Sequence, residues 1–173
     1  MKTRPSQSGF SLIEVLIALV VLSIGLMGIA SMQVVGLQFN QQALTTTRAI
    51  ELASDMADRI RANPNAFIDP TTPGDAYEDA SFNAPGSAAP FACADTVGNT
   101  VTSLNDCTKA NLAAYDIWQW KTALQASSGS GLAAGAGAIT HDWNADRQFS
   151  TYTIDVRWSE RGEDAHYVLE VRL

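Results

Sequence analysis

The sequence predicts an α+β protein in which a long N-terminal helix packs on a small C-terminal antiparallel sheet, with a short second helix between them. Three observations lead to this prediction. Residues 15–47 carry no charged side chain, residues 106–126 place apolar side chains at helical spacing, and residues 152–173 alternate between apolar and polar side chains. The first two patterns are typical of helices, and the third is typical of paired strands.

The first half of the N-terminal helix has the length and composition of a membrane span. Residues 15–37 are mostly Val, Leu, Ile, Ala, Met and Gly, and as a helix they extend for about 35 Å, which exceeds a hydrocarbon core of about 30 Å. Lys2 and Arg4 precede this stretch, so the positive-inside rule keeps the N-terminus in the cytoplasm. The sequence therefore predicts a single pass with the C-terminal part outside the cytoplasm.

The second half of this helix, from Gln41 to Asn63, is amphipathic. Leu44, Met56 and Ile60 fall at helical spacing, while charged residues occupy the other face. Pro64 ends the helix, because proline lacks the backbone donor that the next turn requires. We expect one helix from about Phe10 to Asn63, whose second half packs against the domain that follows.

The rest of the chain predicts a loop, a helix, a linker and strands in that order. Residues 65–105 are rich in Pro, Gly, Ala, Ser, Thr and Asp and show no sustained period, so they predict a loop. The helix at 106–126 has Asp106 or Thr108 as its N-cap, and its apolar face is formed by Ala113, Ile117, Trp120 and Leu124. A Gly/Ala/Ser linker follows at 127–138.

Two C-terminal segments alternate with a period of two and predict a hairpin around Gly162. The apolar positions are Tyr152, Ile154, Val156 and Trp158 in the first strand and Tyr167, Leu169, Val171 and Leu173 in the second. Residues 139–143 are a candidate third strand. Trp120 and Trp158 are expected in the core, whereas Trp118 is harder to bury on the same helical face.

Charge and cysteine content exclude some functions and suggest one bond. Acidic residues outnumber basic ones 18 to 11, giving a net charge of -7, and no basic cluster follows Arg4. A nucleic-acid-binding surface is therefore disfavoured. Cys93 and Cys107 both follow the membrane segment, in the part expected outside the cytoplasm, so we expect them to form a disulfide.

Catalytic and metal sites find little support in the sequence. His141 and His166 lie on different candidate strands, and no nucleophile or paired metal motif accompanies them. The acidic residues between Asp69 and Asp79 form a candidate calcium loop, but their spacing lacks the ligand register of an EF-hand. The sequence thus predicts neither an enzyme nor a bound cofactor or metal, and a solvated acidic loop is preferred.

The run GFSLIEVL at residues 9–16 precedes the membrane segment and resembles the processing signature of class III signal peptides in type IV prepilins and type II secretion pseudopilins. The resemblance implies that prepilin peptidase cuts between Gly9 and Phe10 and that the new amine of Phe10 is methylated. It also implies that Glu14, a carboxylate at the edge of a membrane helix, acts in filament assembly.

A finer resemblance is to PilV-type minor pilins, the pilus modification proteins. It rests on residues 17–26, 53–63 and 114–120. Major pilins usually carry a proline where this chain has Ser31, and this departure favours a minor subunit. The resemblance implies a place in the priming or tip complex of a type IV pilus, with roles in twitching motility and adhesion.

The family also implies a pilin fold with four parts, an inner-membrane location with a periplasmic domain, and later incorporation into the filament. The parts are a leader at 1–9, a transmembrane and assembly half at 10–37, an amphipathic half at 38–63 and a globular domain at 64–173. The implied partners are prepilin peptidase, the assembly platform, other minor pilins and the major pilin. No nucleic acid is implied.

Two alternatives share parts of this prediction. A minor pseudopilin of a type II secretion system has the same processing signature and works in a periplasmic pseudopilus. A membrane-tethered periplasmic binding module has the same anchor, but its leader, residues 1–9, stays uncleaved.

Overall fold

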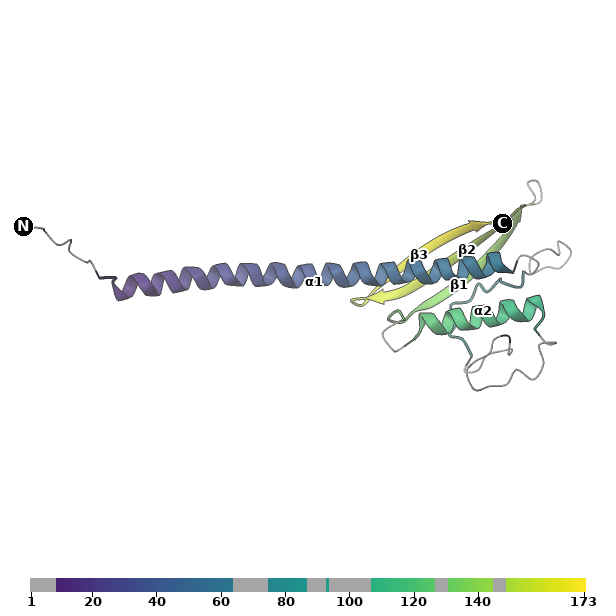
Figure 1. The fold of residues 1–173 in the computed structure, drawn as a ribbon, viewed down its shortest axis with the longest axis horizontal. Helices are drawn as coiled ribbons and strands as arrows, with labels where there is room; N and C mark the ends of the chain where they lie inside the picture. The colour runs from purple at the N-terminus through teal and green to yellow at the C-terminus, as the bar shows by residue number, and fades with distance from the viewer. Residues whose placement is uncertain (1–8, 64–74, 87–92, 94–106, 127–130, 145–148) are drawn as a thin grey trace, which may run out of the picture. The chain divides into compact units, whose positions relative to one another are not determined.

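The computed structural model describes residues 9–63, 75–86, 93, 107–126, 131–144 and 149–173. The chain divides into two compact units, Met1–Ala43 and Leu44–Leu173. Helix α1 (Leu12–Ala62) runs through both units, and the second unit also contains helix α2 and a three-stranded sheet (Figure 1). The expected order of a long helix, a short helix and a small antiparallel sheet is confirmed.

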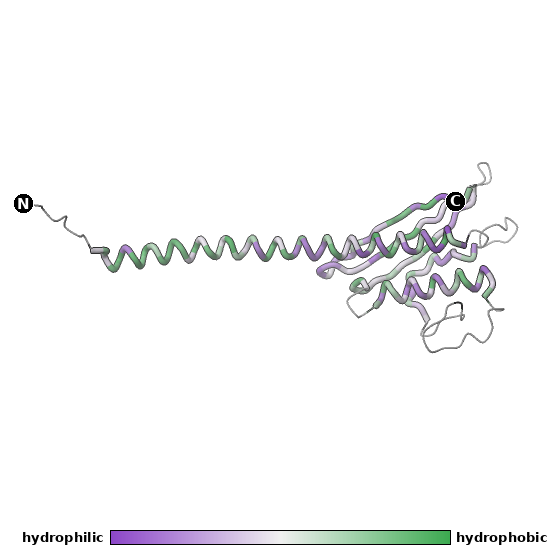
Figure 2. Tube along the Cα trace, viewed as in Figure 1, coloured by the Kyte–Doolittle hydropathy of each residue, from purple (hydrophilic) through white to green (hydrophobic). Residues whose placement is uncertain are grey.

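The first unit contains the part of α1 from Leu12 to Ala43. Every residue from Leu12 to Ala43 is exposed, and Figure 2 shows this part of α1 as predominantly hydrophobic. Among the described residues, α1 is the one helix whose length and composition would allow it to cross a membrane. Ser23 and Ser31 donate their hydroxyls to the carbonyls of Leu19 and Gly28, at 2.7 and 2.8 Å. These hydroxyls therefore do not require water as a partner.

The sheet of the second unit is antiparallel, with strand order β1-β2-β3. The strands are β1 (Ala136–Asn144), β2 (Phe149–Glu160) and β3 (Glu163–Arg172). Arg161 and Gly162 form the turn between β2 and β3 with φ of 55° and 85°. Two consecutive residues with positive φ match the twist of a tight hairpin, which explains the glycine.

The core of the second unit lies between the sheet and one face of α1. From Leu44 onwards α1 buries Ala49, Leu52, Ala53, Met56, Ala57 and Ile60. The facing side of the sheet buries Ile139, Tyr152, Ile154, Val156, Trp158 and Val171. These residues belong to one continuous hydrophobic cluster, as the two sequence periodicities predict.

Helix α2 (Lys109–Leu124) completes this core. Thr108 caps it, because the Thr108 hydroxyl accepts a hydrogen bond from the backbone N–H of Asn111. The predicted apolar face is buried as expected. Trp120 is fully buried and its indole N–H donates to the carbonyl of Leu52 at 2.9 Å, which ties α2 to α1. Trp158 is also in the core, whereas Trp118 is only half-buried.

The predicted linker at 127–138 was wrong in its second half. Leu132 is buried and its N–H donates to the carbonyl of Leu124 at 2.8 Å, while β1 already begins at Ala136. A Cβ on Gly137 would collide with the Trp120 ring. Gly137 therefore lies inside a strand and allows the Trp120 ring to pack closely against it. In the sequence, a glycine among alanines and serines has the composition of a linker, which explains the wrong prediction.

Residues 75–86, which we call the strap, were predicted as loop without regular structure. Tyr77 is nevertheless completely buried. Asp79 and Ile139 exchange both backbone hydrogen bonds, at 2.8 and 2.9 Å, so the strap pairs with the free edge of β1 at that point. The remaining parts of the predicted loop at 65–105 lie outside the described residues, apart from Cys93.

Candidate functional site

The predicted processing site lies directly before the first turn of α1. Gly9 and Phe10 are both exposed, and the carbonyl of Ser11 accepts hydrogen bonds from the N–H groups of Glu14 and Val15 at 3.0 and 3.4 Å. A Cβ on Gly9 would meet no atom within 4 Å. The fold itself therefore does not require glycine at this position.

Glu14 lies in the first turn of α1 and is its only charged residue before Arg48. Phe10 and Glu14 line one shallow groove on the helix surface together with Val15, Ala18, Leu19 and Leu22. A carboxylate on an otherwise apolar helix surface is costly in lipid unless a cation or a hydrogen-bond donor meets it. The groove thus combines an apolar surface with one acceptor group.

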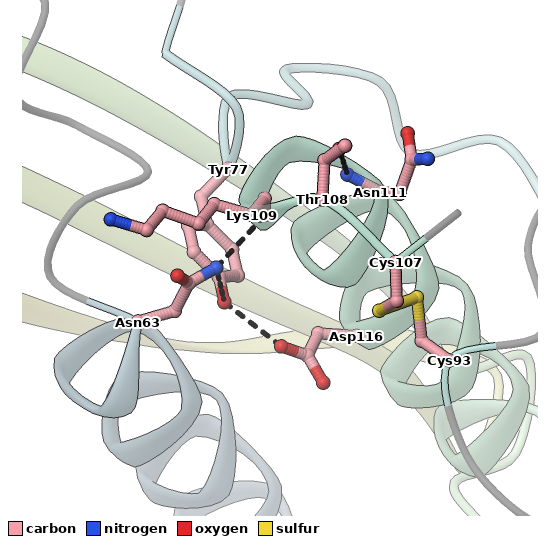
Figure 3. The surroundings of a disulfide bond; sticks show 8 residues. All are labelled: Asn63, Tyr77, Cys93, Cys107, Thr108, Lys109, Asn111 and Asp116. Atoms are coloured by element: carbon pink, nitrogen blue, oxygen red, sulfur yellow. Dashed lines mark hydrogen bonds between the residues drawn. A yellow bond between two sulfur atoms is a disulfide. The ribbon is translucent and has the colours of Figure 1, made fainter. Parts of the chain in front are cut away.

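The second unit contains a polar junction at the end of α1, shown in Figure 3. The side-chain amide of Asn63 donates to the carbonyl of Lys109 at 2.9 Å and to the hydroxyl of Tyr77 at 3.3 Å. That hydroxyl donates in turn to Asp116 Oδ2 at 2.8 Å. The junction therefore joins α1, the strap and α2.

Arg59 extends the junction along α1. Its guanidinium pairs with Asp116 Oδ1 at 3.1 Å and with Asp55 on its own helix at 2.9 Å. Burial raises the pKa of Tyr77 well above its usual value, so its hydroxyl stays protonated and remains a donor to Asp116. The sequence did not predict this set, because Asp116 lies 57 residues from Arg59 and 39 residues from Tyr77 in the chain and meets them only in the folded structure.

The disulfide between Cys93 and Cys107 lies beside this junction, with a Cα–Cα distance of 5.3 Å. Cys107 directly precedes Thr108, the N-cap of α2 (Figure 3). The bond thus holds the start of α2 to a segment that follows the strap. The described residues contain no free cysteine.

A second polar cluster holds the strap to the last turn of α2. The side chain of Lys121 is almost fully buried, and its ammonium group donates to Asp79 Oδ2 at 2.6 Å and to the carbonyl of Ser81 at 2.8 Å. Burial opposes ionisation of Asp79, but hydrogen bonds from Lys121 and Ser81 outweigh it and lower the pKa of Asp79 below its usual value. Lys121 lies four residues after Ile117, so helical spacing alone places it beside the buried face.

The strap is also held to the sheet. The hydroxyl of Tyr152 donates to Asp75 Oδ2 at 2.6 Å, and burial followed by this contact raises the pKa of Tyr152. The strap, which the sequence predicted only as loop, is therefore held by three polar contacts: Asp75 with Tyr152, Tyr77 with Asp116, and Asp79 with Lys121.

The structure brings no catalytic constellation together in the part of the chain it describes. His141 lies against Tyr152 and its ring nitrogen contacts the Ser150 hydroxyl at 3.0 Å, whereas His166 is exposed on β3. Among the described residues no three His, Cys, Asp or Glu side chains gather as a metal site. Asp69, one end of the candidate calcium loop, lies outside the described residues, as do Lys2 and Arg4.

Two family models match the chain. Residues 4–30 match the prokaryotic N-terminal methylation motif, and residues 31–118, about half of the chain, match the type IV pilin Tt1218. The first match contains Gly9, Phe10 and Glu14. No curated protein and no solved structure resembles the chain closely enough to count as a match.

Proposed function

The chain belongs to the type IV pilin Tt1218 family, and from this membership we propose that it is a minor pilin that enters a type IV pilus through α1. In this role it acts in priming of assembly or in the tip complex, as PilV-type minor pilins do. Its partners are other minor pilins, the major pilin, prepilin peptidase and the assembly platform of the inner membrane. The globular unit lies in the periplasm until the subunit enters the filament.

One observation carries the proposal: the processing run at residues 9–16 leads directly into an exposed apolar helix whose only early charge is Glu14. Cleavage between Gly9 and Phe10 places a new amine one turn before this carboxylate, and methylation leaves that amine able to carry a positive charge. Glu14 of one subunit then pairs with the amine of Phe10 in a neighbouring subunit.

Processing is tested by the intact mass of the protein from its native membrane. The mature chain is expected to begin at Phe10 and to have lost Lys2 and Arg4. Gly9→Val is the informative variant, because the structure has open space around Gly9 and the substitution should leave folding unchanged. Recovery of only the full-length wild-type chain from cells with an active peptidase would refute processing at this site.

Assembly is tested with Glu14→Ala. This variant should insert and be cleaved normally, because loss of a charge makes the helix more soluble in lipid. It should then be lost from sheared filaments while it stays in the membrane. Ser23→Ala is the matched control, since the Ser23 hydroxyl bonds to its own helix. Equal amounts of wild type and Glu14→Ala in filaments would leave Glu14 without an assembly role.

The two alternatives are separated by simple observations. If the chain is a minor pseudopilin, deletion of its gene should abolish export of secreted proteins. If it is a pilus subunit, the deletion should instead remove surface pili and twitching. A tethered binding module predicts an intact leader in the native protein. Ser31, which stands where major pilins usually have proline, supports a minor subunit over a major one.

A further inference from the structure

The two edges of the sheet differ in what covers them. At the β1 edge, Asp79 of the strap exchanges backbone hydrogen bonds with Ile139. At the β3 edge, none of the described residues pairs with the outer side of the strand. The sheet is therefore partly capped at one edge and, as far as the structure describes it, open along β3.

The hydrogen-bond pattern shows which backbone groups point to the open edge. Leu173 and Ser150 exchange both backbone hydrogen bonds at 2.9 Å. Because these directions alternate along an antiparallel strand, odd-numbered residues of β3 bond to β2. Even-numbered residues from Asp164 to Arg172 therefore direct their N–H and C=O groups outward, and Val168 is central among them.

β3 carries charged side chains on its outer face, but it lacks the other features that protect an edge strand from pairing. It extends for 10 residues without proline, and its register with β2 is continuous, without a bulge. From Ala165 to Val171 the side chains on the core side are apolar, so no charge points inward along this part of the edge. Two of them, Tyr167 and Leu169, are only half-buried. An added strand would cover both.

The outer face of β3 has a charge pattern that selects a partner. Asp164, Val168 and Arg172 lie on this face at even spacing, with His166 and Glu170 between them, and Val168 is 44% exposed at the centre. Opposite charges facing each other across two strands stabilise the pair, and like charges destabilise it. The edge thus favours a basic residue opposite Asp164 and an acidic residue opposite Arg172.

We propose that the open edge of β3 binds an extended segment of another polypeptide as an added antiparallel strand, with a basic residue opposite Asp164, an apolar residue opposite Val168 and an acidic residue opposite Arg172. Main-chain hydrogen bonds supply the attachment, and the charges set register and direction. That this polypeptide is a neighbouring subunit rests on the proposed function. The binding itself does not depend on it.

The β3 sequence itself satisfies this pattern. In antiparallel pairing centred on Val168, Asp164 of one strand faces Arg172 of the other, and His166 faces Glu170. A second whole copy is nevertheless disfavoured as the occupant. The two-fold rotation that pairs the edges reverses the direction of the whole second unit, including the part of α1 that enters it at Leu44. Under the proposed function neighbouring subunits enter the filament in the same direction, which this two-fold arrangement does not provide.

The test uses the full chain in detergent and a labelled peptide with the sequence of residues 163–172. A control peptide exchanges its Asp and Arg, so that like charges meet Asp164 and Arg172. We expect the first peptide to bind about tenfold tighter than the control. The double variant Asp164→Arg, Arg172→Asp should reverse this preference, which excludes a general effect of misfolding.

Backbone pairing is tested separately at Val168. Val168→Pro removes an outward N–H that β2 does not use, and proline is tolerated at such edge positions. It should weaken peptide binding about tenfold, whereas Val168→Ala, which keeps the outward N–H, should weaken binding much less. Equal binding by Val168→Pro, equal binding of both peptides, or no binding at all would overturn the proposal. A full-chain dimer that Val168→Pro dissociates would assign the edge to a second copy and overturn the occupant proposed here.

Discussion

Lys121 provides a measure of how strongly the strap is held to α2. Its side chain is 5% exposed, and the side chain of its partner Asp79 is 28% exposed. Lys121→Met keeps the length of the side chain and removes the charge, which leaves Asp79 without its cation and the carbonyl of Ser81 without this donor. The variant should therefore destabilise the second unit while its core stays apolar.

The size of the effect follows from the burial of the two groups. Removing one partner of a fully buried ion pair costs about 3–5 kcal/mol. Because water reaches part of the Asp79 carboxylate, we expect about 2–3 kcal/mol here. For a unit the size of Leu44–Leu173, this corresponds to a fall in melting temperature of about 6–10 °C.

The assay is thermal unfolding of the detergent-solubilised chain, followed by near-ultraviolet circular dichroism of the buried tryptophans. Lys109→Met is the matched control, because Lys109 is exposed on the same helix and its loss should change stability by less than about 0.5 kcal/mol. The double variant Asp79→Asn, Lys121→Met should recover part of the loss, since no unpaired charge remains. If Lys121→Met and Lys109→Met melt together, the reasoning is wrong.

Three further predictions follow from named contacts. The stability advantage of wild type over Lys121→Met should be complete above about pH 5 and should shrink as the pH falls through the lowered pKa of Asp79. Denaturant titrations at several pH values measure this advantage, and an unchanged advantage at pH 2 would refute the prediction. Reduction of the Cys93–Cys107 disulfide should lower the free energy of unfolding by about 3 kcal/mol in the chain-entropy model and should speed amide exchange at the start of α2. Exchange near Ile154 is the internal control, and identical exchange at the start of α2 in the oxidised and reduced proteins would contradict the prediction. Gly137→Ala should lower the free energy of unfolding by about 1–3 kcal/mol, because its methyl group meets the Trp120 ring. Ala133→Gly, at an exposed turn position, is the control and should have a much smaller effect. A neutral Gly137→Ala would show that the Trp120 ring moves aside at little cost.

Periodicity was enough to predict the elements whose burial is regular. The apolar face of α2 and the alternation from Tyr152 to Trp158 were both found as expected, because each pattern reports which side of a local element meets the core. The turn at Gly162 was also identified correctly, since positive φ there depends on a local residue preference.

Features that depend on contacts between distant residues were not visible in the sequence. Tyr77 is buried by α1 and α2 together, and nothing in its neighbours in sequence marks it as a core residue. Asp79 was considered as a calcium ligand, yet its charge is met by Lys121, 42 residues away. Lys121 itself had a usable signal, its helical spacing from Ile117, but a buried lysine becomes plausible only once an acidic partner is in place.

The construction of α1 explains why Glu14 is important to the proposed function. The second unit covers α1 from Ala49 onwards, whereas the residues from Leu12 to Ala43 remain exposed. Lipid covers that apolar surface as well as neighbouring helices do, so apolar contacts alone give little reason for the subunit to leave the membrane. A carboxylate differs, because in lipid it costs up to about 2.5–3.5 kcal/mol, and a cationic amine beside it offsets that cost. Glu14 is the one charged group on this surface, so under the proposed function we expect it to be the residue through which a filament is favoured over the bilayer.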